Sequence, residues 1–170
     1  GMRSVLITGG SGFFGKAFAK RLVASDDAER ICIYSRNEYL QAQARIALQD
    51  SPKLRWMIGD VRDSERLRRA MQGVDVVVHA AALKRIEVVD YNVMEAVSTN
   101  VVGTENVVSA AIDAGVRKAV LLSSDKACQP TTTYGLTKAI AERVFLGAKQ
   151  YAGRDGPRFT VCRYGNVAGS

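Results

Sequence analysis

A tyrosine and a lysine spaced four residues apart could carry out acid–base chemistry in this sequence. They bound the segment Tyr134-Gly135-Leu136-Thr137-Lys138, where a helix is expected to begin. A spacing of four places both side chains on one face of a helix. An ammonium close to a phenol favours the phenolate, so Tyr134 is a candidate base near neutral pH and Lys138 is its activating partner.

A glycine-rich segment near the N-terminus has the form of a phosphate-binding turn. Gly10, Gly12 and Gly15 match G-x-G-x-x-G, and Gly9, Gly12 and Gly15 match T-G-x-x-G-x-x-G. A strand-like run precedes the glycines and a helical pattern follows, so backbone and helix N–H groups could approach a pyrophosphate. The candidate cofactor residues here are Gly9, Gly12, Phe13, Phe14 and Gly15. The alternative is a glycine turn that packs without a ligand.

The end of the second predicted strand indicates which dinucleotide would bind. An acid is expected there to hold the ribose 2′-hydroxyl of NAD, but Tyr34-Ser35-Arg36-Asn37 contains no acid before Glu38. Arg36 could bind a 2′-phosphate through two hydrogen bonds and Ser35 could donate another, whereas a carboxylate would repel it. The segment therefore predicts NADP, with NAD less favoured. The alternative for Arg36 is a solvated loop arginine.

Two residues after the third predicted strand are candidates for contacts with adenine. Asp60 could accept a hydrogen bond from the amino group, and Val61 could pack on the ring. The alternative for Asp60 is a helix cap, although Asp63 is better placed to cap a helix from Ser64. His79 ends an apolar strand and is expected to be a hydrogen-bonded core residue rather than a catalyst.

The segments that must position these residues alternate between strand and helix patterns. The predicted strands are Ser4–Thr8, Arg30–Tyr34, Leu54–Ile58, Val74–His79, Ala119–Ser123 and Thr160–Arg163. The predicted helices are Phe13–Ala24, Glu38–Gln49, Ser64–Met71, Val93–Ala114 and Tyr134–Tyr151. Repeated strand–helix units favour a parallel sheet buried on both faces. The expected fold is α/β, a Rossmann-type doubly wound parallel sheet with helices on both faces, in one NAD(P)-binding domain over residues 2–170.

Composition disfavours several classes of function. The net charge is +7, but the basic residues are scattered, which disfavours a nucleic-acid interface. One solvated helix face is expected to hold Arg62, Arg66, Arg68 and Arg69 together with Asp63 and Glu65. No apolar run is long enough for a membrane span. The three cysteines lack metal-ligand spacing, so no metal site is expected, and a reducing cytoplasm fits them.

With further segments, these motifs support a resemblance to known enzymes. The further segments are Ser123-Ser124-Asp125-Lys126, Gly59-Asp60-Val61-Arg62-Asp63, His79-Ala80-Ala81-Ala82-Leu83-Lys84, Thr99-Asn100 and Arg163-Tyr164-Gly165-Asn166-Val167. The whole chain resembles the extended short-chain dehydrogenase/reductases. More specifically it resembles the N-terminal part of the soluble inverting UDP-N-acetylglucosamine 4,6-dehydratases, for which the Asp-Lys pair is the specific signal. The substrate-binding half of that family is expected to be absent from this chain.

The resemblance implies a role for each site residue. Tyr134 would take the proton of the sugar 4-hydroxyl, Lys126 would remove the C5 proton, and Asp125 would protonate the departing 6-hydroxyl. Ser124 could bind a sugar hydroxyl. Further cofactor contacts are implied at Ala80, Ala81, Ala82, Lys84, Asn100, Tyr134, Lys138, Asn166 and Val167. The alternatives are a surface turn for Asp125 and Lys126, a solvated lysine for Lys84 and a buried structural amide for Asn100.

The implied activity is NADP-dependent dehydration of a nucleotide sugar, most specifically UDP-N-acetylglucosamine, in bacterial surface-polysaccharide or flagellin-glycan synthesis. An epimerase or reductase of another nucleotide sugar is the alternative of the same class, and a non-catalytic NADP-binding module is the alternative of another class. The segment Lys84-Arg85-Ile86-Glu87-Val88 departs from the family's usual Leu-Lys-His-Val-Pro, which leaves the sugar open. The expected partner is a UDP-linked sugar. A homo-oligomer of the full-length protein is expected, without contact to nucleic acid or membrane.

Overall fold

Six parallel strands form one sheet in the computed structural model of the chain. The structure describes residues 3–10, 12–80, 92–124 and 131–164. The strand order is β3-β2-β1-β4-β5-β6, and every neighbouring pair is parallel. The strands are β1 (Ser4–Thr8), β2 (Arg30–Ser35), β3 (Leu54–Ile58), β4 (Val76–His79), β5 (Lys118–Ser124) and β6 (Arg158–Tyr164). This strand order belongs to the doubly wound Rossmann-type sheets, the fold class that the sequence predicts.

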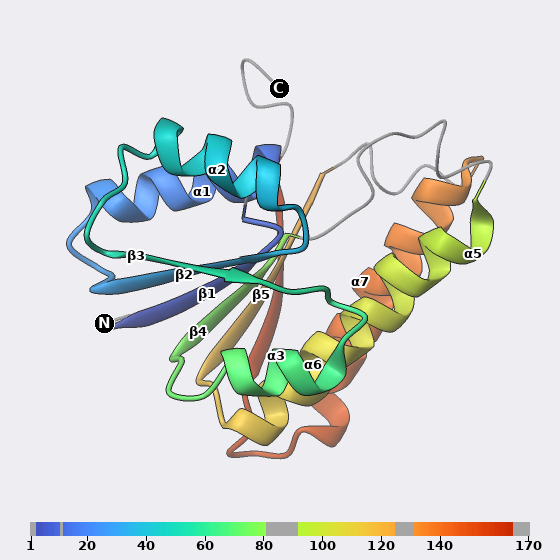
Figure 1. Cartoon of the computed structure of the whole chain (residues 1–170). Helices are drawn as coiled ribbons and strands as arrows, with labels where there is room; N and C mark the ends of the chain where they lie inside the picture. Colours follow the sequence, from blue (N-terminus) through green and yellow to red (C-terminus); the bar gives the residue numbers. More distant parts are fainter. Residues whose placement is uncertain (1–2, 11, 81–91, 125–130, 165–170) are drawn as a thin grey trace.

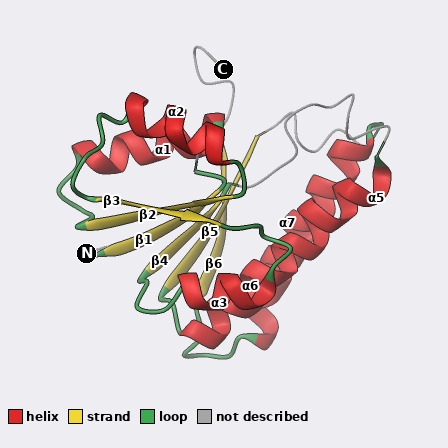
Figure 2. Cartoon of the chain, viewed as in Figure 1, coloured by secondary structure: helices red, strands yellow, loops and turns green. Residues whose placement is uncertain are grey.

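Helices cover both faces of the sheet. One face is covered by α1 (Phe13–Ala24) and α2 (Glu38–Ala47), and the other by α3 (Ser64–Ala70), α6 (Gly103–Ala114) and α7 (Thr133–Tyr151) (Figures 1 and 2). The α6 helix continues a stretch made of α5 (Val93–Ala96) and the π-helical segment η1 (Val97–Val102). The Rossmann-type fold class is therefore confirmed.

Successive side chains of a strand point to opposite faces of the sheet and pack into two separate cores. Leu6 of β1 packs with Phe145 of α7 in the cluster under α3, α6 and α7. Val5 and Ile7, one residue to either side of Leu6, pack with Leu22 of α1 in the cluster under the other two helices. Because both faces of the sheet are covered there, the central strands β1 and β4 contain buried apolar runs, which is why the sequence could reveal them.

Local signals set most of the predicted boundaries. Asn37 and Asp63 cap α2 and α3 by accepting hydrogen bonds from the backbone N–H groups of Leu40 and Arg66 at 3.0 and 3.1 Å. The β4 strand begins at Val76, two residues later than predicted, since the Asp75 carboxylate instead accepts backbone hydrogen bonds at the start of β1. The predicted helix 93–114 forms, but it contains the π-helical segment that no sequence pattern indicated.

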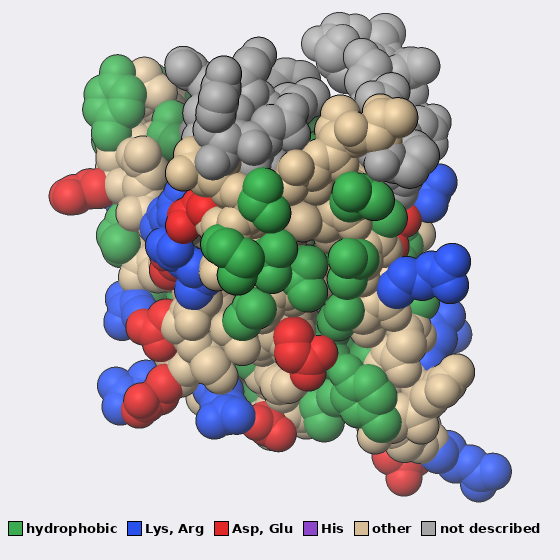
Figure 3. All heavy atoms as spheres, turned by 90° about the vertical axis from the view of Figure 1, so that its right-hand side faces the viewer, with side chains coloured by type: hydrophobic (Ala, Val, Ile, Leu, Met, Phe, Trp, Pro, Cys, Tyr) green, Lys and Arg blue, Asp and Glu red, His purple; other side chains and the backbone are tan. Residues whose placement is uncertain are grey.

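Large apolar side chains remain exposed on α5, η1 and α7. They are Val93, Met94, Val102, Leu136, Ile140, Leu146 and Tyr151. Figure 3, seen from the side of these helices, shows apolar side chains gathered on this face. Association with a second copy of the chain stays a prediction. Within the ranges that the structure describes, none of the helices combines the length and apolar character needed to cross a membrane.

His79, at the end of β4, is fully buried and hydrogen-bonded on both ring nitrogens. Its Nδ1 lies 2.6 Å from the Thr8 hydroxyl and its Nε2 lies 3.0 Å from the Thr104 hydroxyl. Burial, together with the nearby positive charge of Lys138, lowers the pKa of His79 to about 3. The ring is therefore neutral at physiological pH, which confirms the expected core histidine.

This buried histidine makes the free energy of unfolding depend on pH. His79 is the single histidine of the chain, and its pKa is near 6.5 when unfolded and about 3 in the fold. Between these values only the unfolded state takes up the proton, so stability falls as the pH is lowered from 6.5 towards 3. We expect a loss of roughly 2 kcal/mol between about pH 7 and about pH 5, measured by urea unfolding. A His79→Gln variant should be less stable at neutral pH but should lack this slope, and equal wild-type stability at both pH values would contradict the argument.

Candidate cofactor and active site

The carboxyl ends of the parallel strands bring the predicted site residues to one edge of the sheet. The residues at or just after these ends are Gly9, Ser35, Asp60, Ala80 and Ser124. In open α/β sheets, ligands bind outside this edge where the strand order reverses. Here that point lies between β1 and β4. From β1 the chain continues to β2 on one side of the sheet, and from β4 it continues to β5 on the other side.

The glycine turn after β1 brings the start of α1 against the backbone of the turn. The Gly9 N–H donates to the Tyr34 carbonyl at 2.8 Å, and the Gly12 N–H donates to the Gly9 carbonyl at 3.0 Å. A Cβ on Gly15 would lie 2.3 Å from the Gly9 carbonyl oxygen and 2.7 Å from the Gly10 Cα, so no side chain fits there. The turn therefore has the close backbone approach that a pyrophosphate cradle requires. Phe14 lies in the first turn of α1 and is partly buried, while the Phe13 side chain lies outside the described part.

At the end of β2, Ser35 is buried and is held by a residue that the sequence analysis missed. The Gln41 side-chain amide on α2 donates to the Ser35 hydroxyl at 2.9 Å, to the Ser35 carbonyl at 3.1 Å and to the Met57 carbonyl at 2.9 Å. Gln41 thereby joins the ends of β2 and β3. The predicted helix from Glu38 places position 41 one turn in, facing the sheet, and this was the available signal.

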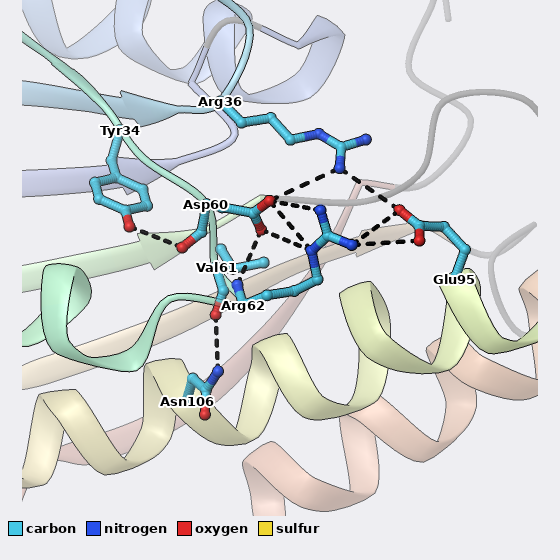
Figure 4. A network of polar contacts seen from close by, with 7 residues as sticks. All are labelled: Tyr34, Arg36, Asp60, Val61, Arg62, Glu95 and Asn106. Atoms are coloured by element: carbon cyan, nitrogen blue, oxygen red, sulfur yellow. Dashed lines mark hydrogen bonds and ion pairs between the residues drawn. The ribbon is translucent and has the colours of Figure 1, made fainter.

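Asp60 and Arg36 lie in a network of four charged side chains (Figure 4). Arg62 donates to the Asp60 carboxylate at 2.8 to 3.2 Å and to the Glu95 carboxylate at 3.2 and 3.3 Å. Arg36 approaches the same carboxylates, with its guanidinium 3.8 Å from Asp60 and 3.6 Å from Glu95. Partial burial acts to raise the pKa of Asp60, but hydrogen bonds from Arg62 and the charges of both arginines bring that pKa below its usual value.

The prediction that Arg62 lies on one helix face with the following arginines is wrong. Arg62 precedes α3 and is therefore not on the helix face, and its partly exposed side chain hydrogen-bonds in the network at the end of β3 (Figure 4). Of the others, Arg66 donates to the Ile58 carbonyl, Arg68 pairs with Asp113 and Arg69 pairs with Glu65. The contact between Arg62 and Glu95 spans 33 residues, so local charge patterning could not reveal it.

Val61 and Asn100 are buried in the fold rather than lying on a surface that is open to a ligand. Val61 is 6% exposed, belongs to the core, and its carbonyl accepts from Asn106 at 3.0 Å. Asn100 is 1% exposed in η1, and its amide donates to the Thr137 hydroxyl on α7 at 3.0 Å. Asn100 is therefore a buried amide that joins two helices. Its Oδ1 has no hydrogen-bond partner among the described residues, and a buried acceptor needs one. Contacts of Val61 and Asn100 with a cofactor stay predictions.

The tyrosine–lysine pair lies at the start of α7, as predicted. Thr132 caps this helix by accepting a hydrogen bond from the Gly135 N–H at 2.9 Å. Tyr134 is partly buried and packs against Ala96 of α5. Lys138 follows on the next turn, is 3% exposed, and lies close enough to His79 for its charge to lower that pKa. The two residues are one helical turn apart, the spacing from which the sequence analysis expects Lys138 to favour a phenolate on Tyr134.

Several predicted site residues lie outside the described residues. They are Ala81, Ala82, Lys84, Asp125, Lys126, Asn166 and Val167, and only the backbone of Ser124 is described, at the end of β5. Ala80 is described directly after β4, where its N–H donates to the Thr8 carbonyl at 3.0 Å. Among the described residues, no group of three His, Cys, Asp or Glu side chains could hold a metal ion.

The contact at Gly15 predicts how a single methyl group would affect dinucleotide binding. Gly15→Ala must separate α1 from the glycine turn, so we expect weaker binding of NADP and NAD alike and a loss of stability of about 1–3 kcal/mol. Gly147→Ala on α7 is the matched control. A Cβ there meets nothing within 4 Å, so this change should stabilise the chain by about 0.5–1 kcal/mol. Calorimetric titration and urea unfolding measure both effects, and wild-type affinity in Gly15→Ala would refute the cradle.

Comparisons with known proteins agree with this geometry. An inverting UDP-N-acetylglucosamine 4,6-dehydratase of Campylobacter jejuni is 46% identical over 168 residues, which cover 99% of this chain and 50% of that protein. A UDP-glucose 4-epimerase of Rickettsia akari is 44% identical over 171 residues, with coverages of 99% and 50%. The chain thus spans about half the length of the curated relatives it matches.

A solved structure and a family model complete the comparison. The dTDP-glucose 4,6-dehydratase DesIV of Streptomyces venezuelae, solved with NAD and TYD bound, superposes with a TM-score of 0.84 at 27% identity, covering 94% of this chain and 55% of that one. Residues 5–170 match the family model described as polysaccharide biosynthesis protein. With the match covering nearly every residue and the fold being that of short-chain dehydrogenase/reductases, the chain belongs to the polysaccharide biosynthesis protein family.

Proposed function

We propose that the chain is the cofactor-binding part of an NADP-dependent 4,6-dehydratase that acts on UDP-N-acetylglucosamine and inverts C5. The observation that carries the proposal is the start of α7, where Tyr134 and the buried Lys138 lie at the same sheet edge as the glycine turn. The 46% identity to the Campylobacter jejuni dehydratase supports the reaction and the substrate. The Asp125-Lys126 pair after β5 supplies the further acid and base that dehydration needs and that cofactor binding does not.

The reaction divides into proton transfers that these side chains would perform. Tyr134 takes the proton of the sugar 4-hydroxyl as C4 is oxidised. A bound NADP would supply the hydride chemistry, as acceptor for the hydride of C4 and then as donor to C6. Because the C4 ketone acidifies the neighbouring proton, Lys126 in its neutral form can remove that proton from C5, and Asp125 protonates the 6-hydroxyl as it leaves as water. Reprotonation of C5 from the opposite face then inverts its configuration.

The surroundings of Tyr134 support its role as the first base. The Thr132 cap and the packing on Ala96 fix the helix start from two sides. His79 stays neutral at physiological pH because its pKa is about 3, so Lys138 is the cation at this place. A lysine buried to this extent loses hydration and gains from a nearby anion, which is the electrostatic reason for a phenolate on Tyr134.

A nucleotide-sugar epimerase is the second candidate, and the 44% identity to the Rickettsia akari epimerase favours it. An epimerase shares the oxidation at C4 and therefore needs the same tyrosine and lysine. It does not need a base for C5 or an acid for the 6-hydroxyl. The two candidates therefore differ at Asp125 and Lys126 and in the product, not at the cofactor.

The preference for NADP is tested by titration. Arg36 is half-exposed at the end of β2, and no acid replaces it there. We expect tighter binding of NADP than of NAD, and a loss of about 1.5–3 kcal/mol of NADP binding free energy in Arg36→Ala. Arg69→Ala, which removes an exposed arginine on α3, is the control and should change neither affinity. Equal affinity of the wild type for NADP and NAD would remove this part of the proposal.

The reaction itself is tested in the full-length protein with UDP-N-acetylglucosamine in deuterated water. We expect a 4-keto-6-deoxy product with one solvent deuteron at C5 and inverted configuration there. Tyr134→Phe should block oxidation, whereas Lys126→Ala should retain transient NADPH absorbance but slow dehydration by about 10²–10⁴-fold. A 4-epimer that keeps its 6-hydroxyl would establish the epimerase instead. Undiminished dehydration by Lys126→Ala would show that another residue is the C5 base.

A further inference from the structure

The charged network at the end of β3 contains two arginines that are bound very differently. Arg62 makes hydrogen bonds of 2.8 to 3.3 Å to both carboxylates, Asp60 and Glu95. Arg36 lies 3.6 and 3.8 Å from the same two groups and makes no tighter polar contact to them. The Arg36 side chain is also the more exposed of the two, at 51% against 38%.

We propose that Arg62 determines cofactor specificity as a positioning residue, by engaging Asp60 and Glu95 so that Arg36 remains available to the 2′-phosphate of NADP. This inference rests on the proposed NADP-dependent function. Arg62 itself does not need to touch the phosphate. Its effect comes from satisfying two carboxylates that would otherwise hold Arg36 and repel the phosphate.

The charge balance of the network gives the physical reason. Two arginines and two carboxylates sum to zero, so the bound phosphate meets Arg36 without a net negative neighbourhood. Without Arg62 the remaining three groups sum to −1, and Arg36 is the only cation left in the network to pair with Asp60 and Glu95. An ionised 2′-phosphate would then compete with two carboxylates for one guanidinium. NAD has a hydroxyl in place of the phosphate and would meet no such competition.

Glu95 has the opposite role in this balance. It comes from α5, far from Asp60 in the sequence, and it lies between the two guanidinium groups (Figure 4). Glu95→Gln leaves the network with one more positive charge and keeps the shape of the side chain. The Glu95→Gln variant should therefore prefer NADP at least as strongly as the wild type does. In the double variant, the same change should offset the loss of Arg62.

A purely structural role for the network makes a different prediction. Arg62 connects the end of β3 with α5, whose Ala96 packs against Tyr134. If the network served only to hold these elements together, its removal would weaken NADP and NAD binding equally. Glu95→Gln, which also breaks the connection, would then add to the damage instead of reversing it.

The experiment measures dissociation constants of NADP and NAD by calorimetric titration of the chain. The variants are Arg62→Gln, Arg62→Lys, Glu95→Gln and the double variant Arg62→Gln/Glu95→Gln. Arg69→Gln is the matched control, because it removes the same charge from an exposed pair with Glu65 on α3. Thermal unfolding of each variant without cofactor reports whether the fold persists.

We expect Arg62→Gln to weaken NADP binding about tenfold and to leave NAD binding within about threefold, since one uncompensated charge a few ångströms away acts mainly on the phosphate. Arg62→Lys should keep most of the preference, and the double variant should recover it in part. The effect of Arg62→Gln should shrink as salt is raised, because the groups are partly exposed. If Arg62→Gln does not fold, Glu95→Gln still tests the proposal, and a lowered NADP preference there would overturn it.

Equal weakening of both cofactors by Arg62→Gln, or no recovery in the double variant, would also overturn the inference. These outcomes are distinct from a failure of the proposed function. If the wild type binds NADP and NAD equally, or if Arg36→Ala leaves the preference intact, the NADP proposal itself is wrong. If the wild type and Arg36→Ala behave as proposed while Arg62→Gln keeps the preference, the role of Arg62 alone is wrong.

Discussion

The contact between α1 and the glycine turn is the constraint on which the cofactor end of the site depends. A side chain at Gly15 would collide with the Gly9 carbonyl, so the helix can begin this close to β1 only without one. The close start directs the first N–H groups of α1 at the sheet edge, which is where we propose that the pyrophosphate binds. Because β1 lies between β2 and β4, this turn is also at the point where the two halves of the sheet diverge. The topology and the phosphate chemistry therefore depend on the same few backbone atoms.

Electrostatic balance is the second constraint at this edge. A carboxylate repels a 2′-phosphate, yet Asp60 and Glu95 lie next to Arg36, the residue proposed to bind that phosphate. Arg62 resolves the conflict by hydrogen-bonding both, which keeps Asp60 ionised and engaged. The same edge also contains a histidine that carries no charge. Burial and the nearby charge of Lys138 keep His79 neutral, and the hydroxyl groups of two threonines satisfy its ring nitrogens.

Sequence reasoning succeeded where a residue acts through its neighbours in the chain. Continuous apolar runs revealed the strands, and Asp63 was identified as a cap because a cap acts on the helix directly after it. It failed where the partner lies far along the chain or where geometry departs from a regular period. Arg62 was assigned to a solvated helix face because its partner Glu95 is 33 residues away. The π-helical segment around Asn100 escaped detection, since it is a local change of backbone hydrogen bonding inside an otherwise continuous helix.

The order of the strands determines where the groups for cofactor binding and the groups for proton transfer are expected to lie. The groups expected to hold the pyrophosphate, the 2′-phosphate and the adenine come from the ends of β1, β2 and β3, which are fixed by backbone hydrogen bonds, by Gln41 and by the charged network. The groups expected to move protons come from the connection between β5 and α7 and from the first turns of that helix. Parallel pairing of β4 with β5 sets the distance between these two sets, because it fixes where both strands end relative to β1. If the proposed roles hold, a change after β5 can alter the substrate without disturbing the cofactor end, which agrees with the presence of one such fold in dehydratases and epimerases alike.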